Sequence, residues 1–134
     1  MGTWAIGCFD NDDALDWLSE LSDSSDLELI ARSLSPEEVK GYYLEAPDCV
    51  RVLCAGEVLA ALRGKPAANL PDELRTWTAA NATLDPSRHL QAAIQKVDRV
   101  LAEHSELDEL WKENEGEYPQ WRASVIDLRA RLGG

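Results

Sequence analysis

A group of oxygen-bearing side chains near the start of the chain is its best candidate for chemistry. The group comprises Asp10, Asn11, Asp12, Asp13 and Asp16. Oxygen ligands close together in sequence are what Ca²⁺, Mg²⁺ and Mn²⁺ prefer, although the spacing lacks the loop glycine of an EF-hand. The same residues are typical of a helix N-terminus, where they cap backbone N–H groups and offset the helix dipole. We expect capping, with a cation site as the alternative.

Other residues with catalytic potential are few. The chain has no phosphate-binding glycine loop, no dinucleotide fingerprint, no zinc-protease motif and no nucleophile elbow. The two histidines, His89 and His104, fall near predicted helix ends, where surface or capping roles are usual. Cys8, Cys49 and Cys54 form no CxxC pair, so we expect buried free thiols; Cys49 and Cys54 as two zinc ligands are the alternative. We expect no catalysis and no cofactor.

Five tryptophans are many for a chain of 134 residues. Tryptophan and phenylalanine side chains bury large areas and are frequent at binding hot spots. Trp4 and Phe9 belong to an irregular segment before the first predicted helix, and we expect both to pack into the helical core. The alternative is that Trp4 contacts a partner.

The formal net charge of −12 restricts the classes of partner. Nucleic-acid binding is disfavoured, because phosphate contacts need clustered Lys and Arg. An acidic surface keeps a protein soluble and attracts basic partners. No basic region followed by an apolar run opens the chain, and no apolar run is long enough to cross a bilayer. The lack of both segments, together with the odd number of cysteines, predicts a cytoplasmic protein without membrane contact.

Hydrophobic periodicity predicts one helix after another, with a break at Ser22–Ser25, a connection at 81–85 and a turn at 113–117. The longest helix is expected after Asp85-Pro86, and Ser105 is expected to cap the next one. The predicted apolar faces are Ala14, Trp17, Leu18 and Leu21; Leu27, Ile30, Ala31 and Leu34; Leu74 and Trp77; Leu90, Ala93, Ile94, Val97, Val100 and Leu101; Leu107, Leu110 and Trp111; and Trp121, Val125, Leu128 and Leu132.

Residues 47–62 are predicted to form the central, most buried helix. Only Asp48, Arg51 and Glu57 are charged there, and they define no polar face. A strand over 49–54 is the rival interpretation. Glu57 is expected to pair with Arg51 or Arg63, or to lie at the rim of the buried surface. A short helix is predicted before this one, from Pro36 to its end at Ala46-Pro47. The sequence thus predicts a single all-α domain over residues 1–134, with six or seven helices.

Several segments carry a resemblance to a known family. The opening Met1-Gly2-Thr3-Trp4, the run Asn11-Asp12-Asp13-Ala14 with Asp16-Trp17, and the later Ser105-Glu106-Leu107-Asp108-Glu109-Leu110-Trp111 are similar to a bacterial family catalogued as domain of unknown function 4259. Ala60 to Pro66 and Leu128 to Leu132 resemble it as well. Ala5 stands where that family usually has Gly. The resemblance implies no activity and no catalytic residues.

The leading functional hypothesis is a non-catalytic interaction protein that binds a basic protein partner near the N-terminal motif, as an immunity protein or antitoxin would. The binding residues would be Trp4, Phe9, Asp10, Asn11, Asp12, Asp13 and Asp16. The alternative is a Ca²⁺-, Mg²⁺- or Mn²⁺-dependent module that uses the carboxylates from Asp10 to Asp16. A third possibility is self-association through residues 121–132; we expect a monomer or a weak homodimer.

Overall fold

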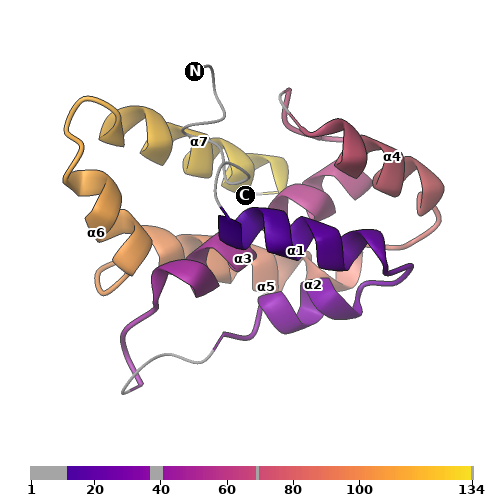
Figure 1. The fold of residues 1–134 in the computed structure, drawn as a ribbon, viewed down its shortest axis with the longest axis horizontal. Helices are drawn as coiled ribbons and strands as arrows, with labels where there is room; N and C mark the ends of the chain where they lie inside the picture. The colour runs from indigo at the N-terminus through magenta and orange to yellow at the C-terminus, as the bar shows by residue number, and fades with distance from the viewer. Residues whose placement is uncertain (1–11, 37–40, 69, 134) are drawn as a thin grey trace.

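The helical pattern is realised in a computed structural model, which describes residues 12–36, 41–68 and 70–133. Within these ranges seven helices pack against one another in a compact domain, confirming the all-α class (Figure 1). They are α1 (Asp12–Ser22), α2 (Glu28–Ser33), α3 (Ala46–Leu62), α4 (Asp72–Ala80), α5 (Ser87–Leu101), α6 (Glu106–Lys112) and α7 (Tyr118–Arg131). The described residues contain no strand, only an isolated parallel bridge between Leu44 and Ser105.

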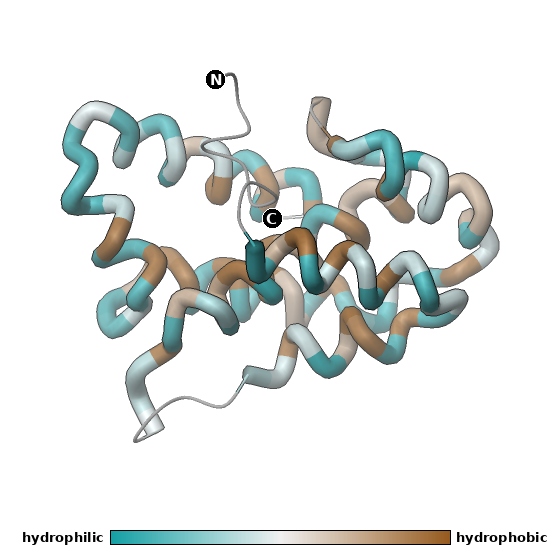
Figure 2. The backbone as a smooth tube through the Cα atoms, viewed as in Figure 1, coloured by the Kyte–Doolittle hydropathy of each residue, from teal (hydrophilic) through white to brown (hydrophobic). Residues whose placement is uncertain are grey.

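The core is organised around α3, which packs against each of the other six helices. Ten of its residues are buried, from Cys49 to Ala60, so the central helix predicted over 47–62 is confirmed and the strand is not. The surrounding helices each have one buried face. Figure 2 shows hydrophobic and hydrophilic residues alternating along α1, whose buried residues are the four predicted ones, Ala14, Trp17, Leu18 and Leu21.

The prediction of a short helix that ends at Ala46-Pro47 is wrong for those of its residues that the structure describes. Gly41 has a positive φ of 80°, and residues 41–45 are not helical. Leu44 instead bonds to the loop before α6: its N–H donates to the His104 carbonyl (2.9 Å), and its carbonyl accepts from the Glu106 N–H (2.9 Å). Pro47 lies in the first turn of α3, where its missing N–H costs nothing. Residues 37–40 lie outside the described residues.

Three smaller expectations are also corrected. Leu29 on α2 is buried, whereas Leu27, which precedes the helix as its N-cap residue, is only partly buried. Leu110 is 50% exposed, although it was expected on the apolar face of α6. The longest helix is α3, with 17 residues against 15 for α5.

The break predicted near His104 is confirmed. His104 has a φ of 65°, in the left-handed region that few residues other than glycine adopt. Ser105 then caps α6, because its Oγ accepts from the Asp108 N–H (3.4 Å). Arg99 at the end of α5 donates to the carbonyls of Tyr42, Glu103 and His104, at 2.6, 3.0 and 3.1 Å. One guanidinium therefore holds two loops together.

The last helix has the apolar face that its spacing predicts, with Trp121, Val125 and Leu128 buried and Leu132 buried just beyond it. The ring of Trp121 stacks on Trp111 of α6 at a centroid distance of 5.9 Å. Among the described residues, no helix combines the length and the apolar character needed to cross a membrane.

Candidate functional site

A cavity of about 610 Å³ opens between α1, α2 and the start of α3. Its volume is in the range of about 300–1,000 Å³ usual for ligand pockets. We call it the acidic cleft, because acids are the commonest side chains in its lining. It is lined by Asp13, Asp16, Trp17, Glu20, Leu29, Arg32, Ser33, Ser35, Pro36, Glu45, Asp48 and Arg51.

The cleft forms because α1 and α2 both lie on α3 and are tied to each other (Figure 1). The indole N–H of Trp17 on α1 donates to Ser33 Oγ on α2 at 2.8 Å, and this hydroxyl donates to the Leu29 carbonyl at 2.8 Å. Trp17 and Ser33 are both buried, so the bond is shielded from water. The tie fixes the two helices that carry most of the charged lining.

Two of the five cleft carboxylates have an arginine partner. Arg32 on α2 reaches Glu20 on α1 (3.2 Å), and Arg51 reaches Asp48 on the first turn of α3 (3.0 Å). Each pair is joined through one nitrogen and one oxygen atom. These two arginines are the only basic side chains among the described residues of the lining.

The other three cleft carboxylates, those of Asp13, Asp16 and Glu45, have no cation within ion-pair distance in the described part of the chain. Asp13 and Asp16 are one turn apart on α1, and Glu45 immediately precedes α3. Negative charge concentrated in a concave site attracts positively charged groups more strongly than the same charge spread over a surface. Chemically, the cleft is therefore suited to binding cations.

Only two of the residues predicted to bind a partner are found in the described lining of the cleft. Asp13 and Asp16 line the cleft, whereas Asp12 is exposed on α1 and does not. Trp4, Phe9, Asp10 and Asn11 lie outside the described residues, so their predicted roles stay predictions.

Sequence reasoning missed five charged residues of the cleft: Glu20, Arg32, Glu45, Asp48 and Arg51. The sequence does carry one signal for Asp48 and Arg51, because they lie three apart on a helix with few other charges. Nothing local indicates that this turn faces α1.

The metal alternative gains no support from the geometry. Asp12, Asp13 and Asp16 lie on one helix, but nowhere in the described ranges do three His, Cys, Asp or Glu side chains come together as ligands. Cys49 and Cys54 form no disulfide in the described part of the chain and are buried in the core, as expected for structural thiols. Cys8 lies outside the described residues.

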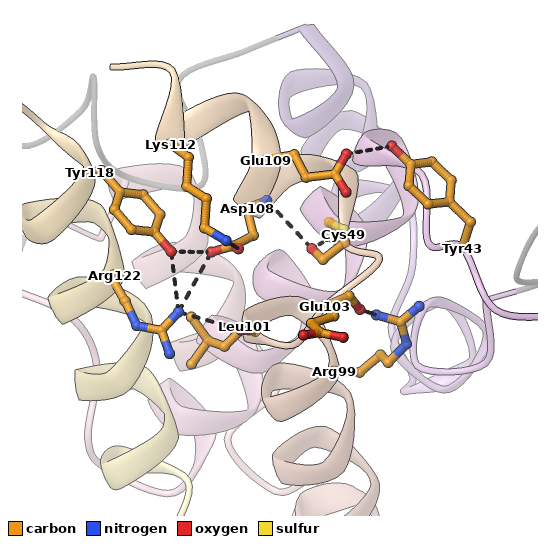
Figure 3. Close-up of polar contacts among 11 residues, drawn as sticks. Tyr43, Cys49, Arg99, Leu101, Glu103, Asp108, Glu109, Lys112, Tyr118 and Arg122 are labelled. Carbon is orange, nitrogen blue, oxygen red and sulfur yellow. Dashed lines mark hydrogen bonds and ion pairs between the residues drawn. The ribbon is translucent and has the colours of Figure 1, made fainter. Parts of the chain in front are cut away.

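A second polar cluster joins α5, α6 and α7 (Figure 3). Its centre is the carboxylate of Asp108, which is 3% exposed. This carboxylate accepts a hydrogen bond from the Tyr118 hydroxyl (2.7 Å) and pairs with Lys112 (3.2 Å) and Arg122 (3.6 Å). Arg122 also donates to the Leu101 carbonyl (3.4 Å). The Lys112 pair lies within α6, whereas the contacts of Tyr118 and Arg122 join α7 to α6 and α5, so the cluster holds the α6–α7 pair in place.

Tyr118 in this cluster and Cys49 beside Ser105 both have raised pKa values. Burial and the hydrogen bond to Asp108 raise the pKa of Tyr118, so its phenol stays protonated near neutral pH. Burial likewise raises the pKa of the Cys49 thiol, whose Sγ lies 3.5 Å from Ser105 Oγ. A thiol is a poor nucleophile and a poor metal ligand, because both roles need the thiolate.

The fold and the cleft together define a small all-helical domain with an acidic groove between its first three helices. The family model described as Domain of unknown function (DUF4259) matches residues 2–124, and the chain belongs to this family. No curated protein and no solved structure matches it.

Proposed function

We propose that this protein is a non-catalytic interaction module whose acidic cleft binds a basic segment of a partner protein. The observation that carries the proposal is the set of three carboxylates, Asp13, Asp16 and Glu45, that share one cavity and have no described cation. A lysine or arginine side chain is the complementary group. An inhibitor that covers the basic site of an effector, as an immunity protein or antitoxin does, is one form of this activity.

Two further features support the proposal. The net charge of −12 draws basic proteins toward the molecule and raises their association rate at low ionic strength. The raised pKa values of Cys49 and Tyr118 weigh against base or nucleophilic catalysis at those side chains. Cys49 and Cys54 form no disulfide among the described residues, which is compatible with a reducing compartment, and we place the protein in the cytoplasm.

The test uses a short, fluorescently labelled oligo-arginine peptide as the probe. Wild-type protein is expected to bind it in a saturable, salt-sensitive manner. The variant Asp13→Asn, Asp16→Asn, Glu45→Gln should bind roughly tenfold more weakly, because each exposed ion pair adds about 0.2–1 kcal/mol. Fluorescence anisotropy at two salt concentrations measures both affinities, and circular dichroism verifies that the variant is folded.

The control variant Glu73→Gln, Glu113→Gln, Glu115→Gln changes the net charge by the same amount. All three of its residues are exposed and none lines the cleft. If binding depends on the cleft, this variant keeps most of the wild-type affinity. Equal weakening in both variants would mean that only overall charge attracts the peptide, and the proposal would be wrong. It would also be wrong if the wild-type protein did not bind.

A further inference from the structure

Residues 41–45, which we call the strap, lead into α3 without being helical. The structure describes all five of them, and only Leu44 is buried. The hydroxyl of Tyr43 makes a polar contact with α6, donating to Glu109 at 3.1 Å (Figure 3). Segments with few buried apolar groups open at a lower free energy than the core of the same protein. The strap therefore has the properties of a segment that opens by itself.

The strap covers the thiol of Cys49, near the start of α3. Cys49 is 0% exposed, and its Sγ donates to the Leu44 carbonyl at 3.8 Å and lies 3.5 Å from Ser105 Oγ. Leu44 and Ser105 form the isolated bridge that joins the strap to the loop before α6. The thiol becomes accessible when this bridge opens, even while α3 stays packed. Cys54 differs, because it lies in the middle of α3 and is reached only when the surrounding helices separate.

One side chain and one strained backbone position close the strap. Arg99 Nη2 donates both to the Tyr42 carbonyl in the strap (2.6 Å) and to the His104 carbonyl (3.1 Å). The His104 carbonyl also accepts from the Leu44 N–H (2.9 Å). With a φ of 65°, His104 is in the left-handed region, where a residue other than glycine stays only when its surroundings hold it. Arg99 thus holds the strained residue whose carbonyl binds the strap.

We propose that Arg99 and the left-handed His104 form a latch, and that its release lets the strap open as a local unit and uncovers the Cys49 thiol. The helical core stays folded in the open state. His104 then returns to an ordinary negative φ, so the relief of its strain favours opening. Glu45 belongs both to the strap and to the lining of the acidic cleft, so opening also changes the cleft. The latch itself does not depend on the proposed function.

The experiment measures how fast N-ethylmaleimide alkylates each thiol of the folded protein. Trypsin cleaves after Lys40, Arg51 and Arg63, so Cys49 and Cys54 fall into separate peptides, 41–51 and 52–63, for mass spectrometry. Each rate is divided by the rate of the same thiol in the urea-unfolded chain. In the wild-type protein Cys49 should react about tenfold faster than Cys54 or more. Local opening exposes little surface, so dilute urea should accelerate Cys54 steeply and Cys49 only slightly.

Two variants test the latch. Arg99→Gln should accelerate the alkylation of Cys49 about tenfold, because the closed strap loses hydrogen bonds from a charged donor. Arg88→Gln removes an exposed arginine from the same helix and should leave the Cys49 rate unchanged. His104→Gly should slow Cys49 about threefold, because glycine adopts the left-handed conformation without strain. Tyr42→Ala reports separately the loss of the ring contact between Tyr42 and His104 (5.1 Å).

A core variant distinguishes local opening from unfolding. Leu128 on α7 packs against Gly56 of α3, and Leu128→Val should accelerate Cys54 while leaving Cys49 at the wild-type rate. Circular dichroism verifies that every variant is folded.

Two results would overturn the inference. Equal protection and equal urea dependence of the two thiols in the wild-type protein would mean that Cys49 is exposed only by global unfolding. If Arg99→Gln or His104→Gly changed the Cys54 rate but not the Cys49 rate, that residue would keep its closed arrangement in the open state. It would then not be part of a latch.

Discussion

Arg131 and Glu57 form a two-pronged ion pair although 74 positions separate them in the sequence. The two nitrogens of Arg131 lie 2.9 and 3.1 Å from the two carboxylate oxygens of Glu57, and the side chains are only 15% and 13% exposed. Arg63 donates to the backbone carbonyl of Arg131 at 2.9 Å. These contacts fasten the last turn of α7 to α3.

Replacing Glu57 with glutamine should destabilise the protein, because the largely buried Arg131 would keep its charge with only the exposed carboxylate of Asp127 (2.8 Å) as a partner. We expect a loss of about 2 kcal/mol in the free energy of unfolding, measured by urea denaturation. Asp98→Asn is the matched control, since it breaks an exposed two-pronged pair with Arg129 and should cost less than about 1 kcal/mol. Equal losses would contradict this account.

Replacing Ser33 with alanine should destabilise the contact between α1 and α2. The buried indole N–H of Trp17 would lose its acceptor at Ser33 Oγ, which costs about 1–3 kcal/mol. Ser19 lies on α1 and is exposed, so Ser19→Ala should change stability by less than about 0.5 kcal/mol. Urea denaturation of both variants checks the prediction. If Ser33→Ala is as stable as Ser19→Ala, the buried hydrogen bond does not hold the two helices together.

Tyr43 should titrate abnormally at high pH. Desolvation and its hydrogen bond to Glu109 (3.1 Å) raise the pKa of Tyr43 to about 12, from an ordinary value of 10.0. A pKa that is higher in the folded state stabilises the fold below pH 10, and this contribution is lost as the pH rises through about 12. In a pH titration followed by tyrosinate absorbance, the Tyr43→Phe variant should therefore lack the step that lies at the highest pH.

Glu109→Ala tests the cause of this shift. Removing the acceptor and its negative charge should lower the pKa of Tyr43, so the highest absorbance step should move to lower pH. Circular dichroism over the same pH range identifies any step that is due to unfolding. An unchanged titration in Glu109→Ala would mean that the carboxylate does not determine the pKa.

The repeat of apolar residues predicted most helix faces, because burial of one face is a local property of the sequence. Trp121, Val125 and Leu128 are an example: their spacing alone placed them on one side of α7. The partner of Glu57 could not be predicted this way. Arg51 and Arg63 are the arginines nearest to it in sequence, whereas its actual partner, Arg131, comes close only when α7 packs on α3.

The cleft was predictable only in part for the same reason. Asp13 and Asp16 stood out as part of a dense acidic run, but Glu45 is an isolated acid that meets them across the packed helices. The wrong prediction of a helix before Pro47 has a different cause. Its residues are compatible with a helix, but Leu44 satisfies its backbone groups by pairing with the loop around Ser105, sixty positions away.

The position of α3 has a consequence for how the chain folds. A helix that is apolar on nearly all sides is not stable alone in water, since its stability comes from the helices that cover it. The backbone amides of α3 should therefore exchange hydrogen for deuterium only when the whole molecule unfolds. A shortened chain lacking any one of the surrounding helices would expose part of α3 and tend to aggregate, so we expect the described helices to unfold as one cooperative unit.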